Sequence, residues 1–211
     1  MSNQARWLLL SLSGGWCLVL IAARIPVAGR SDYLFLVWNL FLAVLPLVFS
    51  EILRTARSRG VRWSLAPVWF LFFPNAPYIL TDLLHLKQRT GVPLWYDLLL
   101  LMSCAAVALI FGFVSLQQMQ DMVAKAWGAV TSWIFVVITL FAAGFGIYLG
   151  RFLRWNSWDI VTNPTGLAWD VVRHLGDPYT YPATYGVTLG FGVLLSLCYA
   201  MFSGLQRQPA Q

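Results

Sequence analysis

Long apolar runs constrain this chain most, because a hydrocarbon core about 30 Å thick needs about 20 apolar residues per helix. About six such runs lie along the 211 residues and nearly fill the chain, which leaves no room for a separate soluble domain. Charged residues make up only 10% of the chain and the mean hydropathy is +0.70, whereas soluble domains carry about 25% charged residues. The sequence therefore predicts an all-α fold, a polytopic transmembrane helical bundle of about six spans in one integral membrane domain over residues 1–211.

The bounds of the spans follow from the apolar runs and from the charged, proline and glycine residues that end them. The third span is expected to be broken at 74–77, and one short interfacial helix is expected over about 164–175. The six spans are expected at about 7–23, 33–53, 63–88, 93–116, 127–149 and 183–202.

The orientation rests on one short basic connection, between the second and third spans. Cytoplasmic loops are rich in Lys and Arg, so both termini are predicted to be cytoplasmic, in a bacterial inner or internal membrane. The net charge of +6 does not indicate nucleic acid, because the basic residues sit in short loops beside apolar spans. We expect anionic lipids at the four arginines of this connection, Arg54, Arg57, Arg59 and Arg62.

The third span contains prolines where a single helix would otherwise run. It reads WSLAPVWFLFFPNAPYILTDLLHLKQR, and Pro74 with Pro77 should interrupt the helix near the middle of the bilayer. Asn75 is then expected to cap a restarted helix. Broken helices at this depth line a cavity or are buried in protein, and they mark binding sites in many transporters.

Polar residues recur at spacings of three and four after the break. Tyr78, Thr81, Asp82 and His85 form a stripe on an otherwise apolar helix. Ionisable residues at membrane depth are functional candidates, but Asp82 and His85 could instead pair with an arginine and only stabilise the fold. Two ligands do not make a metal site, so we predict none.

The end of the fifth span is rich in arginine and aromatic residues, in the run GFGIYLGRFLRWNSWD. Its arginines either reach the lipid phosphates or turn inward to meet Asp82 or an anionic ligand. The loops after the third and fifth spans lie on one side of the membrane in either orientation. The candidate ligand-binding residues are therefore Asn75, Tyr78, Asp82, His85, Arg151 and Arg154.

The segment after the fifth span should form the short interfacial helix. Leu167, Val171 and Leu175 form an apolar stripe that is expected to lie along the membrane as a lid, with His174 in solvent. In the sixth span, Gly186 and Gly190 form a GxxxG pair. This pair is expected to pack within the chain, and the alternative is contact with a membrane-protein partner.

Three runs carry a resemblance to a known family. FFPNAPYILTDLLHL at 72–86, PLWYDL at 93–98 and GFGIYLGRFLRWNSWD at 144–159 resemble a family of bacterial polytopic membrane proteins known only as a domain of unknown function. The resemblance covers the whole chain and implies a compact helical membrane domain. It implies no activity, substrate or catalytic residue.

Three classes of function are compatible with these features. The preferred hypothesis is a small-ligand or anion binding or transport-type protein that uses the broken third span. The alternative is an accessory or assembly subunit of a larger membrane complex. An intramembrane enzyme acting on lipid through Asp82 or His85 is less favoured, because the chain lacks the GxSxG, HExxH, P-loop and dinucleotide motifs. The sequence names no cofactor.

Overall fold

The computed structural model describes residues 3–28, 32–88 and 91–206, and these residues form helices and turns without any strand. Four of the described helices, α1, α2, α5 and α8, are long and apolar enough to cross a membrane. Helices of this length and composition are those of a helical membrane protein. The elements are α1 (Asn3–Ala28), α2 (Phe35–Thr55), α3 (Arg59–Phe72), α4 (Asn75–Tyr78), the 3-10 helix η1 (Ile79–His85), α5 (Leu94–Phe152), α6 (Asp159–Thr162), α7 (Pro164–Gly176) and α8 (Pro182–Gln206).

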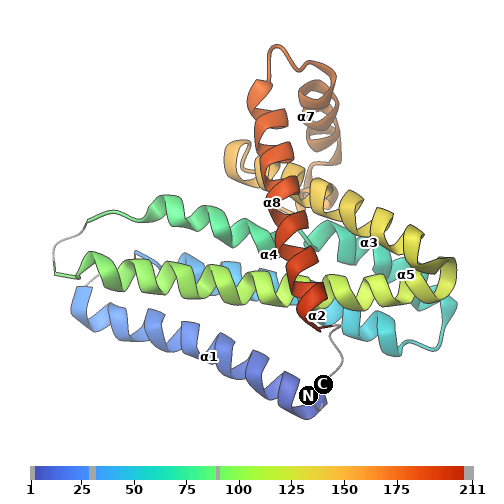
Figure 1. The fold of residues 1–211 in the computed structure, drawn as a ribbon. Helices are drawn as coiled ribbons and strands as arrows, with labels where there is room; N and C mark the ends of the chain where they lie inside the picture. Colours follow the sequence, from blue (N-terminus) through green and yellow to red (C-terminus); the bar gives the residue numbers. More distant parts are fainter. Residues whose placement is uncertain (1–2, 29–31, 89–90, 207–211) are drawn as a thin grey trace.

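The longest helix, α5, organises the bundle (Figure 1). It packs mainly against α8 and α2, and α1 lies along one edge of the bundle. Helix α8 runs across the bundle, and α7 lies beside the N-terminal part of α8 (Figure 1). Two apolar clusters form the core: one joins α1 and α2 to the first half of α5, and the other joins α3 and α8 to both halves of α5.

Helix α5 contains a sharp bend at Gly128. It spans 59 residues, and Gly128 alone within it has non-helical angles, with φ 88° and ψ 170°. Positive φ is readily adopted only by glycine, which is why the bend falls there. A loop was expected between 116 and 127, but the helix continues through these residues because Gln, Met, Ala and Lys are good helix formers. The two halves of α5 are thus 94–127 and 129–152.

The third predicted span consists of α3, α4 and η1. Phe73 and Pro74 keep right-handed helical angles between α3 and α4, so the hydrogen-bond pattern changes there while the backbone stays helical. Pro74 occupies the N-cap position of α4 without a side-chain cap, so the expected capping by Asn75 is wrong. The physical reason is that a capping residue needs an extended backbone, whereas the chain enters α4 already helical.

Three glycines of α5, one in its first half and two in its second, let α4 and the preceding Pro74 pack closely against the backbone of α5. A Cβ at Gly112 would lie 2.9 Å from the Cβ of Ala76, and a Cβ at Gly146 would lie 2.6 Å from the Cβ of Pro74. A Cβ at Gly150 would lie 2.9 Å from the ring of Tyr78. Larger residues at these positions would push α4 out of its place.

We expect Gly146→Ala to lower the free energy of unfolding by about 1–3 kcal/mol, because the proline ring it meets cannot rotate away. Gly186→Ala is the matched control, since an added Cβ there meets no described atom within 4 Å. The control should be neutral or slightly stabilising, as alanine favours a helix. Circular dichroism during titration with SDS in mixed micelles measures both values, and equal stabilities would contradict the close contact.

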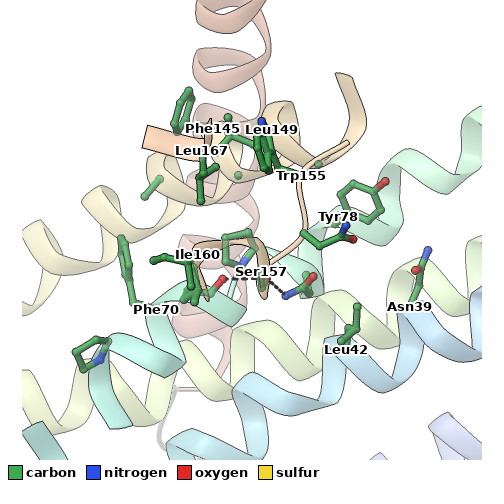
Figure 2. Close-up of a pocket in the computed structure, with 18 of the residues that line it drawn as sticks. Asn39, Leu42, Phe70, Tyr78, Phe145, Leu149, Trp155, Ser157, Ile160 and Leu167 are labelled. Carbon is green, nitrogen blue, oxygen red and sulfur yellow. Dashed lines mark hydrogen bonds between the residues drawn. The ribbon is translucent and has the colours of Figure 1, made fainter. Parts of the chain in front are cut away.

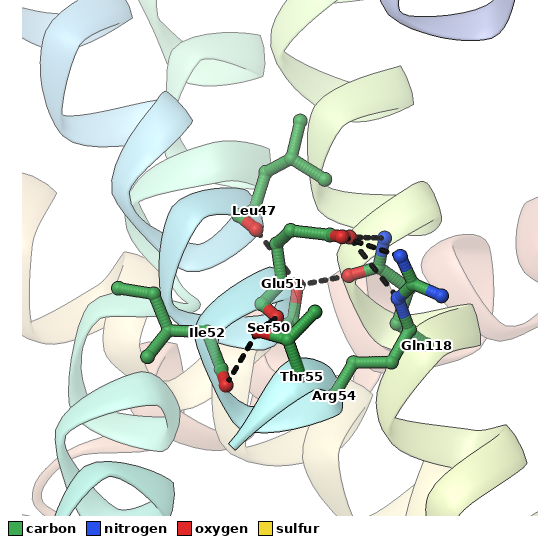
Figure 3. A network of polar contacts seen from close by, with 7 residues as sticks. All are labelled: Leu47, Ser50, Glu51, Ile52, Arg54, Thr55 and Gln118. Atoms are coloured by element: carbon green, nitrogen blue, oxygen red, sulfur yellow. Dashed lines mark hydrogen bonds and ion pairs between the residues drawn. The ribbon is translucent and has the colours of Figure 1, made fainter. Parts of the chain in front are cut away.

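A polar network joins the C-terminal end of α2 to Gln118 in the first half of α5, near the basic connection (Figure 3). Ser50 donates to Oε1 of Gln118 at 2.7 Å, and Nε2 of Gln118 donates to Glu51 at 2.9 Å. Arg54 forms an ion pair with Glu51 and remains 45% exposed. Arg57 and Arg62 are also exposed, whereas the side chain of Arg59 lies outside what the structure describes. Binding of anionic lipid by these arginines stays a prediction.

Candidate functional site

A buried ionic cluster joins the end of α5 to η1. Nη2 of Arg151 donates to Oδ1 of Asp82 at 2.8 Å, and Nε donates to the hydroxyl of Thr81 at 2.9 Å. Nη1 lies 3.0 Å from Nε2 of His85. Since an arginine nitrogen can only donate, Nε2 of His85 accepts here, and the proton of the neutral ring is on Nδ1. The stripe of the third span therefore meets an arginine of the fifth.

Helix α2 completes this cluster through Asn39. Its Nδ2 donates to Oδ2 of Asp82 at 2.8 Å, so both oxygens of the carboxylate accept a hydrogen bond. The side chain of Asp82 is 2% exposed and that of Arg151 is 16% exposed. A carboxylate buried this deeply needs both a charged partner and hydrogen bonds, and it has them. The positive and negative charges of Arg151 and Asp82 balance.

A second buried ion pair lies next to the cluster. Arg24 of α1 donates through Nε and Nη2 to the two oxygens of Asp97 in α5, at 2.7 and 3.1 Å. The side chains are 2% and 1% exposed. The guanidinium of Arg24 lies 4.4 Å from the ring centroid of Tyr33, whose hydroxyl donates to the carbonyl of His85 at 3.1 Å. Tyr33 thus connects the two ion pairs.

A cavity of about 530 Å³ opens beside α4 (Figure 2). Most of its wall is apolar or aromatic, and none of the described residues that line it is charged. Such volumes and such walls are typical of small-molecule sites. The polar lining residues are Asn39, Asn75, Asn156 and Ser157, and the aromatic ones are Trp38, Phe70, Tyr78, Phe145 and Trp155.

Two side chains belong both to the cavity and to the ionic cluster. Asn39 lines the cavity and donates to Asp82. Tyr78 lines the cavity, and its ring centroid lies 5.1 Å from the guanidinium carbon of Arg151. Figure 2 shows Asn39 and Tyr78 on the same side of the cavity. A molecule in the cavity would therefore lie one side chain away from the ion pair.

Comparison with known proteins assigns the chain to a family. A family model described as "Protein of unknown function (DUF1361)" matches residues 38–198. The chain belongs to this family. The matched region of the DUF1361 chain includes every residue of the ionic cluster and every residue that lines the cavity. Neither a curated protein nor a solved structure matches the chain.

Helix α7 of the DUF1361 chain covers one side of the cavity. Leu167 of α7 lines the cavity, and Nε1 of Trp155 donates to Oδ2 of Asp170 at 2.9 Å. Asn75 fixes another part of the wall, because its Nδ2 donates to the carbonyl of Phe72 at 2.8 Å and to the hydroxyl of Ser157 at 2.9 Å. These bonds hold the loop after α5 against the start of α4.

One prediction about α7 is corrected by the structure, and another stays a prediction. Leu167 and Val171 are half-buried and Leu175 is 47% exposed, so the placement of this stripe along the membrane stays a prediction. His174 was expected in solvent but is 7% exposed. Its Nδ1 lies 2.7 Å from the carbonyl of Asp170, and its ring packs 4.1 Å from that of Tyr181. These contacts involve residues of the same helix and the following turn, which helical periodicity alone does not reveal.

Trp155→Phe should loosen α7, because it removes the indole N–H that donates to Asp170 while an aromatic ring remains in the cavity wall. One hydrogen bond contributes about 1 kcal/mol, so backbone amides of α7 should exchange hydrogen about fivefold faster. Hydrogen–deuterium exchange with mass spectrometry measures this rate. Trp169→Phe, at an exposed position, is the control and should leave it unchanged.

The structure brings together most of the residues that the sequence singled out. Asn75 and Tyr78 line the cavity, and Asp82, His85 and Arg151 share contacts. Arg154 lies outside the cluster: it is exposed, at a left-handed φ of 63°.

Several residues were missed or misread. Asn39, Tyr33, Arg24 and Asp97 were not predicted as part of the site, although Asn39 is a polar residue inside an apolar run. Gly186 and Gly190 were expected to pack within the chain, but a Cβ at either would meet no described atom within 4 Å. The close glycine contacts of α8 lie at Gly192 instead, against Phe141. Among the described residues, no group of three or more His, Cys, Asp or Glu side chains could hold a metal ion.

Proposed function

We propose that this DUF1361 chain is a membrane protein that binds a small uncharged molecule in the cavity beside α4, as part of a binding or transport function. The observation that carries this proposal is a cavity of about 530 Å³ that reaches Asn75 at the junction of α3 and α4. Small-molecule sites occupy about 300–1,000 Å³ and combine an apolar wall with a few polar groups.

The charge of the site favours a neutral ligand over an anion. Arg151 supplies the positive charge of the cluster beside the cavity, and Asp82 balances that charge. The described lining offers amides, the hydroxyls of Ser157 and Tyr78, and aromatic rings. A ligand with an apolar or ring-shaped body and a few hydrogen-bonding groups fits this wall, because each of its polar groups would find a partner there.

The cluster gives the proposed ligand a route to the rest of the fold. A ligand that hydrogen-bonds to Asn39 would compete with Asp82 for the amide of Asn39. A ligand that stacks on Tyr78 would displace a ring that lies against Arg151. Either contact would weaken the ion pair between η1 and α5, and this is the change that would couple binding to movement in a transport-type protein.

We further propose about six membrane crossings with both termini in the cytoplasm of a bacterial cell. The two halves of α5, at 94–127 and 129–152, are each long enough to cross separately. Together α3, α4 and η1 would form the third crossing. The contact between Asp82 and Arg151 supports this arrangement, because it requires the loops after the third and fifth crossings to share one side.

Photolabelling tests the proposed site directly. The probe is 3-trifluoromethyl-3-phenyldiazirine, a compact neutral aromatic molecule, and trifluoromethylbenzene serves as its unreactive competitor. We expect labelling of Trp155 and Tyr78 that excess competitor suppresses. Ala142→Trp, which fills the cavity, should abolish this saturable fraction, whereas Ala200→Trp on an exposed face of α8 should not. Labelling that neither competitor nor Ala142→Trp reduces would contradict the proposal.

One observation favours the alternative of an accessory or assembly subunit. Gly186 and Gly190 of α8 leave a shallow surface that no described residue covers, and surfaces of this kind accept a neighbouring helix in membranes. If this surface is the functional one, Gly190→Leu should detach the chain from its complex while saturable photolabelling is absent. Saturable labelling of the purified chain alone would favour the ligand-binding proposal.

A further inference from the structure

A second hollow, which we call the α1–α2 groove, lies away from the ionic cluster. Its volume is about 440 Å³, and it is bounded by α1, α2 and Phe111 of α5. Gly14 and Gly15 have no side chains to fill the groove. A Cβ at Gly14 would contact only Phe111, at 3.6 Å, and a Cβ at Gly15 would meet no described atom within 4 Å. Apart from Ser11, the lining side chains are apolar.

The length of the groove matches one leaflet of a bilayer. Its α1 wall runs from Trp7 to Leu18, which corresponds to about 16 Å along a helix. Half of a hydrocarbon core about 30 Å thick is about 15 Å. An extended acyl chain that enters at the Trp7 end would therefore reach the middle of the membrane at the other end.

A cation stands at the Trp7 end of this groove. Arg6 precedes the groove residue Leu10 by four positions, so the two share a face of α1. The guanidinium carbon of Arg6 lies 5.8 Å from the ring centroid of Trp7, which lines the groove. The Nε of Arg6 is buried and has no hydrogen-bond partner among the described residues. This nitrogen is covered by protein atoms, so what the groove offers a ligand is the positive charge of the guanidinium at one end of an otherwise apolar surface.

We propose that the α1–α2 groove binds one acyl chain of an anionic phospholipid whose phosphate accepts a hydrogen bond from Arg6. Arginine suits this role because its guanidinium matches a phosphate group and its stem lies along apolar surface. The charge complementarity identifies the occupant as an anionic phospholipid, because a single guanidinium lies at one end of an otherwise apolar groove. The groove is independent of the cavity beside α4.

Native mass spectrometry of the full chain, stripped of lipid and then supplied with phosphatidylglycerol, tests the proposal. The wild type should retain one phosphatidylglycerol more strongly than phosphatidylcholine. Arg6→Gln should weaken this first binding event about tenfold, because it removes a charge-assisted hydrogen bond. Arg173→Gln removes the same charge from an exposed position of α7 and should leave the first binding event unchanged.

A second pair of variants tests the acyl-chain part. Gly15→Leu places a side chain in the groove from a position where a Cβ meets no described atom within 4 Å, and it should weaken binding about as much as Arg6→Gln. Gly186→Leu, at a similarly open position of α8, should not. Equal retention by wild type and Arg6→Gln, or an equal loss in Arg173→Gln, would overturn the proposal. It would also be overturned if Gly15→Leu bound normally, or if inorganic phosphate competed with the lipid at equal concentration.

Discussion

Replacing Arg151 with glutamine should lower the free energy of unfolding by about 3–5 kcal/mol, because it leaves the carboxylate of Asp82 buried without a cation. The side chain of Asp82 is 2% exposed, so water cannot take over from the guanidinium. Asn39 would still donate one hydrogen bond to Asp82 but would supply no charge. Unfolding of the purified protein by SDS in mixed micelles measures this loss.

Two further variants separate the charge from the packing. Asp82→Asn should cost less than Arg151→Gln, because Arg151 is 16% exposed and can reach water. The double variant Arg151→Gln with Asp82→Asn should recover most of the loss, since two neutral amides can hydrogen-bond to each other. If the double variant were as unstable as the sum of the two single variants, the ion pair would not be the cause.

Replacing Arg24 with leucine should have a comparable effect, about 3–5 kcal/mol, at the second ion pair. Asp97 would be left 1% exposed and charged in the first turn of α5, where the partial positive charge of the helix N-terminus offsets only part of the cost. The same SDS titration measures the effect, and the fraction of protein inserted in the membrane shows whether folding in the cell also suffers.

Replacement of the acidic partner, Asp97, gives the control for this pair. Asp97→Leu should cost less than Arg24→Leu, because Arg24 keeps a second carboxylate, that of Asp32, at 3.9 Å. The double variant Arg24→Leu with Asp97→Leu should approach the wild type, as replacement of buried ion pairs by apolar residues often does. A larger loss for Asp97→Leu than for Arg24→Leu would contradict this description of the pair.

The sequence predicted the helical membrane class well because this class depends on the length and composition of local runs of residues. A run of apolar residues identifies a helix that can cross a membrane, without knowledge of what the helix packs against. The close pairing of Asp82 with Arg151 also had a basis in the sequence: the loops after the third and fifth spans share a side, and few side chains there carry charge. The choice of Arg151 over Arg154 needed the structure, because the backbone leaves the helix at Leu153 before it reaches Arg154.

Other parts of the site depend on contacts between distant elements. Asn39 is 43 residues from Asp82, and Arg24 is 73 residues from Asp97, so no local pattern joins them. The bend of α5 depends on one positive φ angle at Gly128, which a sequence with 16 glycines does not single out. The burial of His174 likewise depends on how α7 folds back onto the end of α5 and the turn after it.

Cysteine accessibility in the membrane tests most directly whether the cavity beside α4 is an open site. In a chain whose three native cysteines are replaced, Ala142→Cys would stand in the cavity wall, Ile138→Cys on the apolar outer face and Leu101→Cys in the core. Methanethiosulfonate reagents react with the thiolate, which forms in water and not in lipid. Reaction of Ala142→Cys alone is the expected result. If Ala142→Cys is as inert as Ile138→Cys and Leu101→Cys, the cavity is closed to water and the proposed binding site is wrong.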